Sequence, residues 1–154
     1  MDNSPLLIKP HHFLDIIRDF GAGRVHTPHP YGHAVHLAAV RIREDRGLLL
    51  RLTSGADFIC TPCRLLCNGH CTDSTGTPGR IVSKEAYNRL IDRRLFRRFG
   101  LHEGALMHAD EFCALALTGL GQIKEIYREE KNEKTAWRAE NLFRGLRSFL
   151  ESGS

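Results

Sequence analysis

The sequence lacks the features that mark several common functional classes. No apolar run approaches the roughly 18 residues that a membrane-spanning helix needs, and no basic leader followed by an apolar stretch opens the chain. There is no Walker-type phosphate loop and no G-x-S-x-G nucleophile elbow, and "GAG" at 21–23 lacks the third glycine of a dinucleotide fingerprint. We therefore expect a cytoplasmic protein with no membrane partner, and we find no nucleotide-binding or serine-hydrolase motif.

The composition is that of an ordinary globular domain. Of 154 residues, 42% are hydrophobic and 26% are charged, which is enough apolar material for one buried core. The formal net charge is +4, so an acidic protein or a nucleic acid is permitted as a partner but not required.

The periodicity of apolar residues predicts a mainly α fold, or an α+β variant with one or two short strands. The expected pattern is a small helical domain around a long cysteine-rich cluster-binding loop. Helices are expected at about 10–20, 33–46, 83–99, 110–120 and 136–150, a strand at about 48–54 and the loop at 54–82. The polar stretch 128–135 reads as a solvated turn or helix break. Residues 1–120 would form the metal-binding domain, with 121–154 a helical extension packed on it.

Four of the five cysteines fall in "CTPCRLLCNGHC", at 60, 63, 67 and 71. Five is an odd number and cytoplasmic thiols stay reduced, so a disulfide framework fits poorly. The spacing also matches one helix face, but Pro62 and Asn68–Gly69 interrupt a helix there. Soft thiolates favour zinc or an iron–sulfur cluster. The short spacing, near the bacterial ferredoxin run, favours the cluster, because a zinc ion usually takes two separated ligand pairs.

Histidines and arginines give weaker signals. His11 and His12 open the first helix about 100° apart, so at most one is expected to face a site, as a ligand or proton donor. His29, His33 and His36 form a less favoured metal group, and Cys113 reads as a buried core thiol. Arg89, Arg93 and Arg97 form one helix face that could meet an acidic redox protein, with nucleic acid less favoured.

The order of four segments resembles a known family. "PHHFLD", "FGAG" with "PYG", "DFICTPCRLLCNGHC" and "LIDRRLFRRFGL" follow one another as in the bacterial and archaeal domain of unknown function family 1284, whose members are described as iron–sulfur proteins. The resemblance covers about residues 6–120. It implies three cluster ligands that match Cys60, Cys63 and Cys71. Asp15 stands where the family has a further cysteine, and Cys67 is additional here.

The sequence thus predicts one iron–sulfur cluster, with [4Fe–4S] favoured, in an electron-transfer or other redox role. The expected ligands are Cys60, Cys63, Cys67 and Cys71, with His11, His12 and Asp15 as candidates for catalysis or for the fourth ligand. Two alternatives stay open. One is an iron–sulfur enzyme with an open iron near His12 and Asp15, and the other is a structural-zinc module that contacts nucleic acid or protein.

Overall fold

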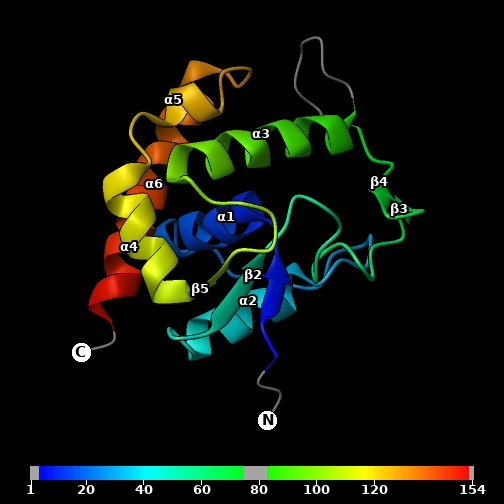
Figure 1. Ribbon diagram of the computed structural model, residues 1–154, viewed down its shortest axis with the longest axis horizontal. Coiled ribbons are helices and arrows are strands. Elements are labelled where there is room, and N and C mark those ends of the chain that lie inside the picture. The colour runs from blue at the N-terminus through cyan, green and yellow to red at the C-terminus, as the bar shows by residue number, and fades with distance from the viewer. Residues whose placement is uncertain (1–3, 75–82, 153–154) are drawn as a thin grey trace.

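The computed structural model describes residues 4–74 and 83–152. Its helices are α1 (Pro10–Gly21), α2 (Val35–Glu44), α3 (Lys84–Phe99), α4 (Ala109–Gly119), α5 (Ile123–Ile126) and α6 (Asn132–Glu151). Its strands are β1 (Leu6–Ile8), β2 (Leu49–Leu52), β3 (Leu66–Cys67), β4 (His70–Cys71) and β5 (Leu106–His108). The mainly helical class is confirmed (Figure 1). None of the described helices has the length and apolar character needed to cross a membrane.

Helix ends follow local signals in the sequence. Pro10 occupies the first position of α1, where a missing N–H costs nothing. The Ser83 hydroxyl accepts a hydrogen bond from the Ala86 N–H at 3.2 Å and caps α3. Gly100 ends α3 in the left-handed conformation, with φ of 66°. The bounds expected for these two helices are therefore confirmed to within a residue or two.

Strands are more numerous than expected. β1 pairs in parallel with β2, β2 pairs in antiparallel with β5, and β3 and β4 form a separate hairpin. Along β1 and β2 the side chains alternate, with Leu6, Ile8, Leu50 and Leu52 facing the core and Leu7 and Arg51 exposed. Strands of two or three residues are too short to produce an alternating pattern of their own, which is why only β2 was predicted.

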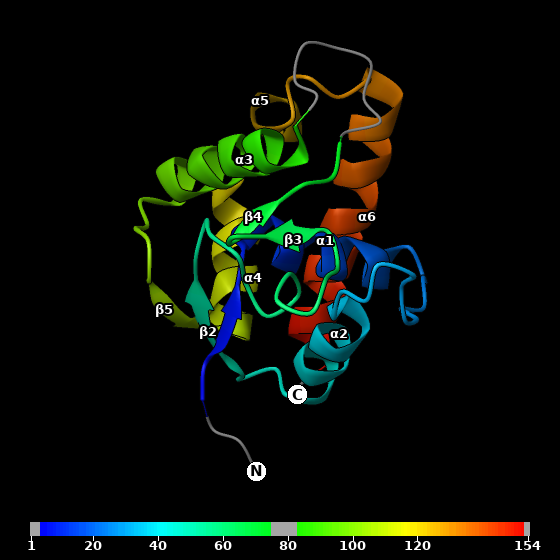
Figure 2. The ribbon, with the colours of Figure 1, turned by 90° about the vertical axis from the view of Figure 1, so that its right-hand side faces the viewer.

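The central helix α1 packs against α6, which lies behind α4 in Figure 1 and beside α1 in Figure 2. Gly21 and Gly145 meet where the two helices cross. A Cβ on Gly145 would overlap the carbonyl oxygen of Ile17, and one on Gly21 would overlap that of Asn141. The crossing therefore requires two residues without side chains. It brings the C-terminal helix into the same core as the rest of the chain.

The expected solvated break at 128–135 is wrong in part. α6 begins at Asn132, inside this polar stretch. Glu130 and Thr135 are buried. The charge of Glu130 is compensated by Arg138, which donates to both of its carboxylate oxygens at 3.2 and 2.9 Å. The sequence shows that Glu130 is charged but not that it pairs with Arg138, so a polar stretch of this kind is predicted to face solvent.

Candidate functional site

A cavity of about 450 Å³ lies between α1, the start of α3, α6 and the segment 56–74. Among the residues that line it are His11, His12, Asp15, Cys60, Cys63 and Cys71. The structure therefore brings three of the four predicted cysteine ligands together with all three candidate residues of α1. Cavities of this size are typical of small-molecule and cofactor sites.

Asp57 organises the segment that carries the first cysteines. Its carboxylate is fully buried, and it accepts hydrogen bonds from the N–H of Cys60 at 3.0 Å and the N–H of Lys9 at 2.7 Å. The turn continues with the N–H of Cys63 donating to the carbonyl of Cys60 at 2.9 Å. Burial opposes ionisation of Asp57, but the His12 imidazole and these N–H donors hold its pKa below the usual range. The Cys60 backbone is thus fixed to the start of α1.

Each of the paired histidines contacts its own buried carboxylate. His12 Nδ1 lies 2.8 Å from Asp57 Oδ2, and His11 Nδ1 lies 2.9 and 3.0 Å from the two oxygens of Asp92 in α3. Burial acts to lower the pKa of His11, but the Asp92 carboxylate outweighs it and the pKa is raised. The ring centroids are 4.4 Å apart and tilted by 50°. Both residues line the cavity, whereas the sequence predicted that at most one would face a site. Carboxylates from two different segments hold the neighbouring rings.

One compact set of metal-ligand atoms occurs in the described part of the chain. An atom from each of His12, Asp57 and Cys60 lies within 4.8 Å of the other two. In the metal-free protein, burial and then the Asp57 carboxylate raise the pKa of the Cys60 thiol to about 12. A metal bound there would have to displace the thiol proton, as coordinating metals do.

Cys67 is the loop cysteine that does not line the cavity. It pairs with His70 across the β3–β4 hairpin, and the turn between them uses positive φ angles at Asn68 (52°) and Gly69 (77°). Cys67 is exposed and does not line the cavity, whereas Cys71 does. The N–H of Cys71 donates to Glu85 Oε2 at 3.1 Å, which ties the hairpin to the first turn of α3.

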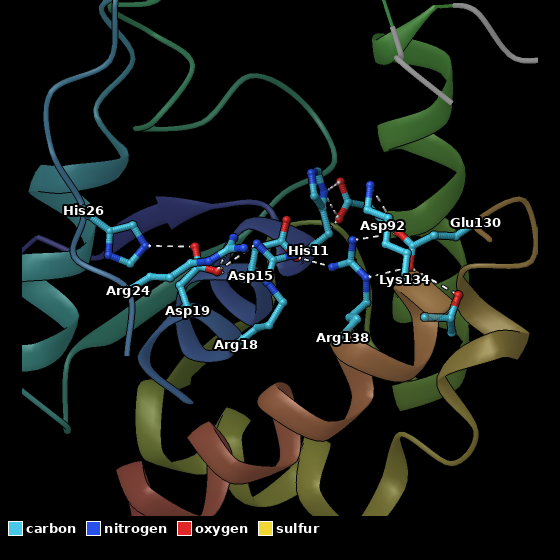
Figure 3. A network of polar contacts seen from close by, with 11 residues as sticks. His11, Asp15, Arg18, Asp19, Arg24, His26, Asp92, Glu130, Lys134 and Arg138 are labelled. Carbon is cyan, nitrogen blue, oxygen red and sulfur yellow. Dashed lines mark hydrogen bonds and ion pairs between the residues drawn. The ribbon is translucent and has the colours of Figure 1, made fainter. Parts of the chain in front are cut away.

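Asp15 takes part in an ion-pair network (Figure 3). Its Oδ1 accepts from Arg138 at 2.6 Å and from Arg18 at 3.1 Å. Arg138 also pairs with Glu130 and stacks over the Tyr127 ring at 4.0 Å. Burial opposes ionisation of Asp15, but Arg138 and Arg18 hold its pKa below the usual range. The Asp15 carboxylate is therefore already charge-compensated by two guanidinium groups.

Of the remaining candidate residues, His33 lines the cavity and the others do not. His29 and His33 stack with ring centroids 4.2 Å apart, and Cys113 is buried in the core as expected. On α3, Arg93 and Arg97 are exposed, while Arg89 forms an ion pair with Glu85. One arginine of the predicted face, Arg89, is therefore paired with Glu85, which also accepts a hydrogen bond from the β3–β4 hairpin.

Sequence reasoning missed Asp57, Asp92 and Lys9. Asp57 precedes Cys60 by three residues, the spacing at which a carboxylate accepts a backbone N–H in a turn. Asp92 carries no local signal, because its partner His11 is 81 residues away. Lys9 lines the cavity and is only 2% exposed, and its ammonium donates to the Ser54 carbonyl at 3.2 Å.

Comparisons with protein-family models, with curated proteins and with solved structures found no match for this chain. The family resemblance stays a prediction that rests on the four quoted segments.

Proposed function

We propose that this protein binds one iron–sulfur cluster, of the [4Fe–4S] type, in the cavity beside α1. Cys60, Cys63 and Cys71 are its thiolate ligands, and its role is electron transfer or other redox chemistry in the cytoplasm. The observation that carries the proposal is that these three cysteines line one cavity with His11 and His12. Three soft ligands around a space of this size suit a cluster, whose irons occupy separate corners.

The charges around the cavity also support an anionic cluster. Two cationic residues line the cavity, the nearly buried Lys9 and Arg138 of α6. Thiolate-ligated clusters carry negative charge, and a buried charge needs a compensating partner. The C-terminal helix would therefore belong to the cluster site, although the family resemblance ends near residue 120.

A zinc site is the second candidate, and the His12–Asp57–Cys60 group favours it. Four thiolates on zinc would lie about 3.8 Å apart, as follows from tetrahedral bonds of about 2.3 Å. Within residues 4–74 and 83–152, no three of the loop cysteines come within 4.8 Å of one another. A tetrathiolate zinc site would thus need the loop to rearrange. The ligand atoms of His12, Asp57 and Cys60 already lie within 4.8 Å of one another, so metal analysis must include zinc.

An acidic redox protein remains the proposed partner. Arg93 and Arg97 offer exposed positive charge on α3, the helix whose first turn holds the cysteine hairpin. A partner that docks there would approach the cavity from the α3 side. Its association rate should fall steeply with added salt, as electrostatic steering predicts.

The test is purification without oxygen, followed by the visible spectrum and by counts of iron, acid-labile sulfide and zinc. About four iron and four sulfide per chain, with a broad band near ~400 nm, is the expected result. Cys60→Ser, Cys63→Ser and Cys71→Ser should each lose most of the iron. Cys67→Ser is the matched control from the same loop and should keep it.

Two outcomes would overturn the proposal. A colourless protein with about one zinc per chain would replace the cluster by a mononuclear site. Equal loss of iron in Cys67→Ser and Cys71→Ser would mean that the loop binds the cluster in an arrangement different from the one that defines this cavity.

A further inference from the structure

We propose that His12 supplies the fourth protein ligand of the cluster, through its Nε2 atom, alongside Cys60, Cys63 and Cys71. This inference rests on the proposed function, since it concerns the iron that those three cysteines leave without a protein ligand. Existing contacts decide which nearby side chain is free to bind that iron.

The two ligands suggested by sequence are poorly disposed for this iron. Cys67 is exposed on the β3–β4 hairpin and does not line the cavity. Asp15 lines the cavity, but its Oδ1 accepts from Arg138 and Arg18 at 2.6 and 3.1 Å. Two guanidinium groups already compensate the Asp15 carboxylate, so it is a weaker donor to iron, and binding an iron would draw its charge away from Arg138, a nearly buried guanidinium.

His12 has the geometry of a metal-binding histidine. Its Nδ1 is held by the buried carboxylate of Asp57 at 2.8 Å, which leaves Nε2 as the nitrogen able to bind a metal. Histidine ligands of metals are usually oriented in this way, with the second nitrogen donating its proton to a carboxylate or carbonyl. His12 lines the cavity, and only 20% of its side chain is exposed.

Asp57 fixes His12 and Cys60 relative to one another. One oxygen of its carboxylate accepts from the Cys60 N–H and the other contacts His12 Nδ1. A ring nitrogen of His12 and the Sγ of Cys60 lie within 4.8 Å of each other. His11 has an equally good carboxylate partner, but that partner is Asp92 on α3. The orientation of His11 is therefore set independently of the cysteine loop, and His12 is the better placed of the pair.

A Cys3His ligand set has a functional consequence. With four protein ligands no iron is left open to a substrate, which favours an electron carrier over a cluster enzyme. Replacing thiolate by neutral imidazole raises the reduction potential of a cluster, as it does in clusters with two histidine ligands. His12→Cys should therefore keep the cluster and lower its potential.

The test is pulsed EPR of the reduced full-length protein, grown with ¹⁵N-labelled histidine and with unlabelled histidine. The expected result is a strong hyperfine coupling to one histidine nitrogen that changes with the isotope. His12→Cys should keep its iron and sulfide and lose the coupling. His11→Ala, the matched neighbour, should retain the coupling.

Each contrary result has a separate meaning. A wild-type cluster without histidine nitrogen coupling overturns the assignment of His12 but leaves the three-cysteine site standing. A coupling that persists in His12→Cys, or that disappears in His11→Ala, also overturns it. Failure of the wild-type protein to hold any cluster defeats the proposed function itself. If His12→Cys does not fold, the wild-type isotope comparison and His11→Ala still decide the question.

Discussion

His12 and Asp57, 45 residues apart in the chain, are joined by a contact of 2.8 Å between Nδ1 and Oδ2. The same buried carboxylate accepts N–H groups from Lys9 and Cys60. One side chain therefore connects the start of α1 to the first turn of the cysteine segment. Loss of this carboxylate should affect stability and metal binding together.

Asp57→Asn should lower the free energy of unfolding of the metal-free protein by about 2–3 kcal/mol. Hydrogen bonds to a charged group are worth about 1.5–3 kcal/mol each, and asparagine has an NH2 group, which cannot accept, in place of one of the two carboxylate oxygens. Urea denaturation measures the change. Asp45→Asn is the control, because Asp45 is exposed and accepts the Gly47 N–H at 3.1 Å in a surface turn. Similar losses in the two variants would contradict the role given to Asp57.

Arg138→Met should destabilise the fold by about 3–5 kcal/mol, the usual cost of removing one partner of a buried ion pair. The variant leaves Glu130, only 5% exposed, without its guanidinium partner. Arg144→Met removes an exposed partner of Glu140 on the same helix and should cost no more than about 0.5 kcal/mol. Thermal and urea unfolding of the pair give the comparison, and equal losses would count against a buried network.

Stability should fall at acid pH because of Asp15. Its folded-state pKa lies below the unfolded value of about 3.9, so ionisation favours the folded state. This contribution is complete well above the unfolded pKa and is lost as the pH falls through 4 and below. Urea unfolding of the metal-free protein between pH 7 and pH 2 should show the decline. Asp15→Asn should be less stable at pH 7, and its stability should decline less steeply with falling pH. If the stability of the two proteins falls in parallel, Asp15 is not the cause of the acid sensitivity.

Gly145→Ala should disrupt the crossing of α1 and α6 and cost at least about 2 kcal/mol, in the upper range for overpacked cores. The added methyl group would overlap the Ile17 carbonyl oxygen, which a helix cannot move without bending. Gly119→Ala is the control, since its Cβ would meet its nearest neighbours at 3.8 Å. That variant should be neutral or stabilised by up to about 1 kcal/mol. A neutral Gly145→Ala would show that the helices can separate at little cost.

Local sequence signals determined much of this structure. The helical class, the limits of α1 and α3, the single predicted strand β2 and the buried Cys113 all follow from periodicity, caps and glycine stops within a few neighbouring residues. The cysteine loop was also predicted as a candidate metal site, because four thiols within twelve residues are rarely present without a ligand to bind. These features depend on short-range interactions, which a sequence displays directly.

Only the tertiary structure decided which of these residues share one space. Cys67 and Cys71 are four residues apart, yet a two-residue hairpin turn exposes the first and leaves the second on the cavity. His11 and His12 are neighbours on a helix, yet both line that cavity, and their rings contact carboxylates 81 and 45 residues away. Asp15 is committed to Arg138, which lies 123 residues later on α6. Such pairings depend on how distant elements pack, and local sequence patterns carry no record of that packing.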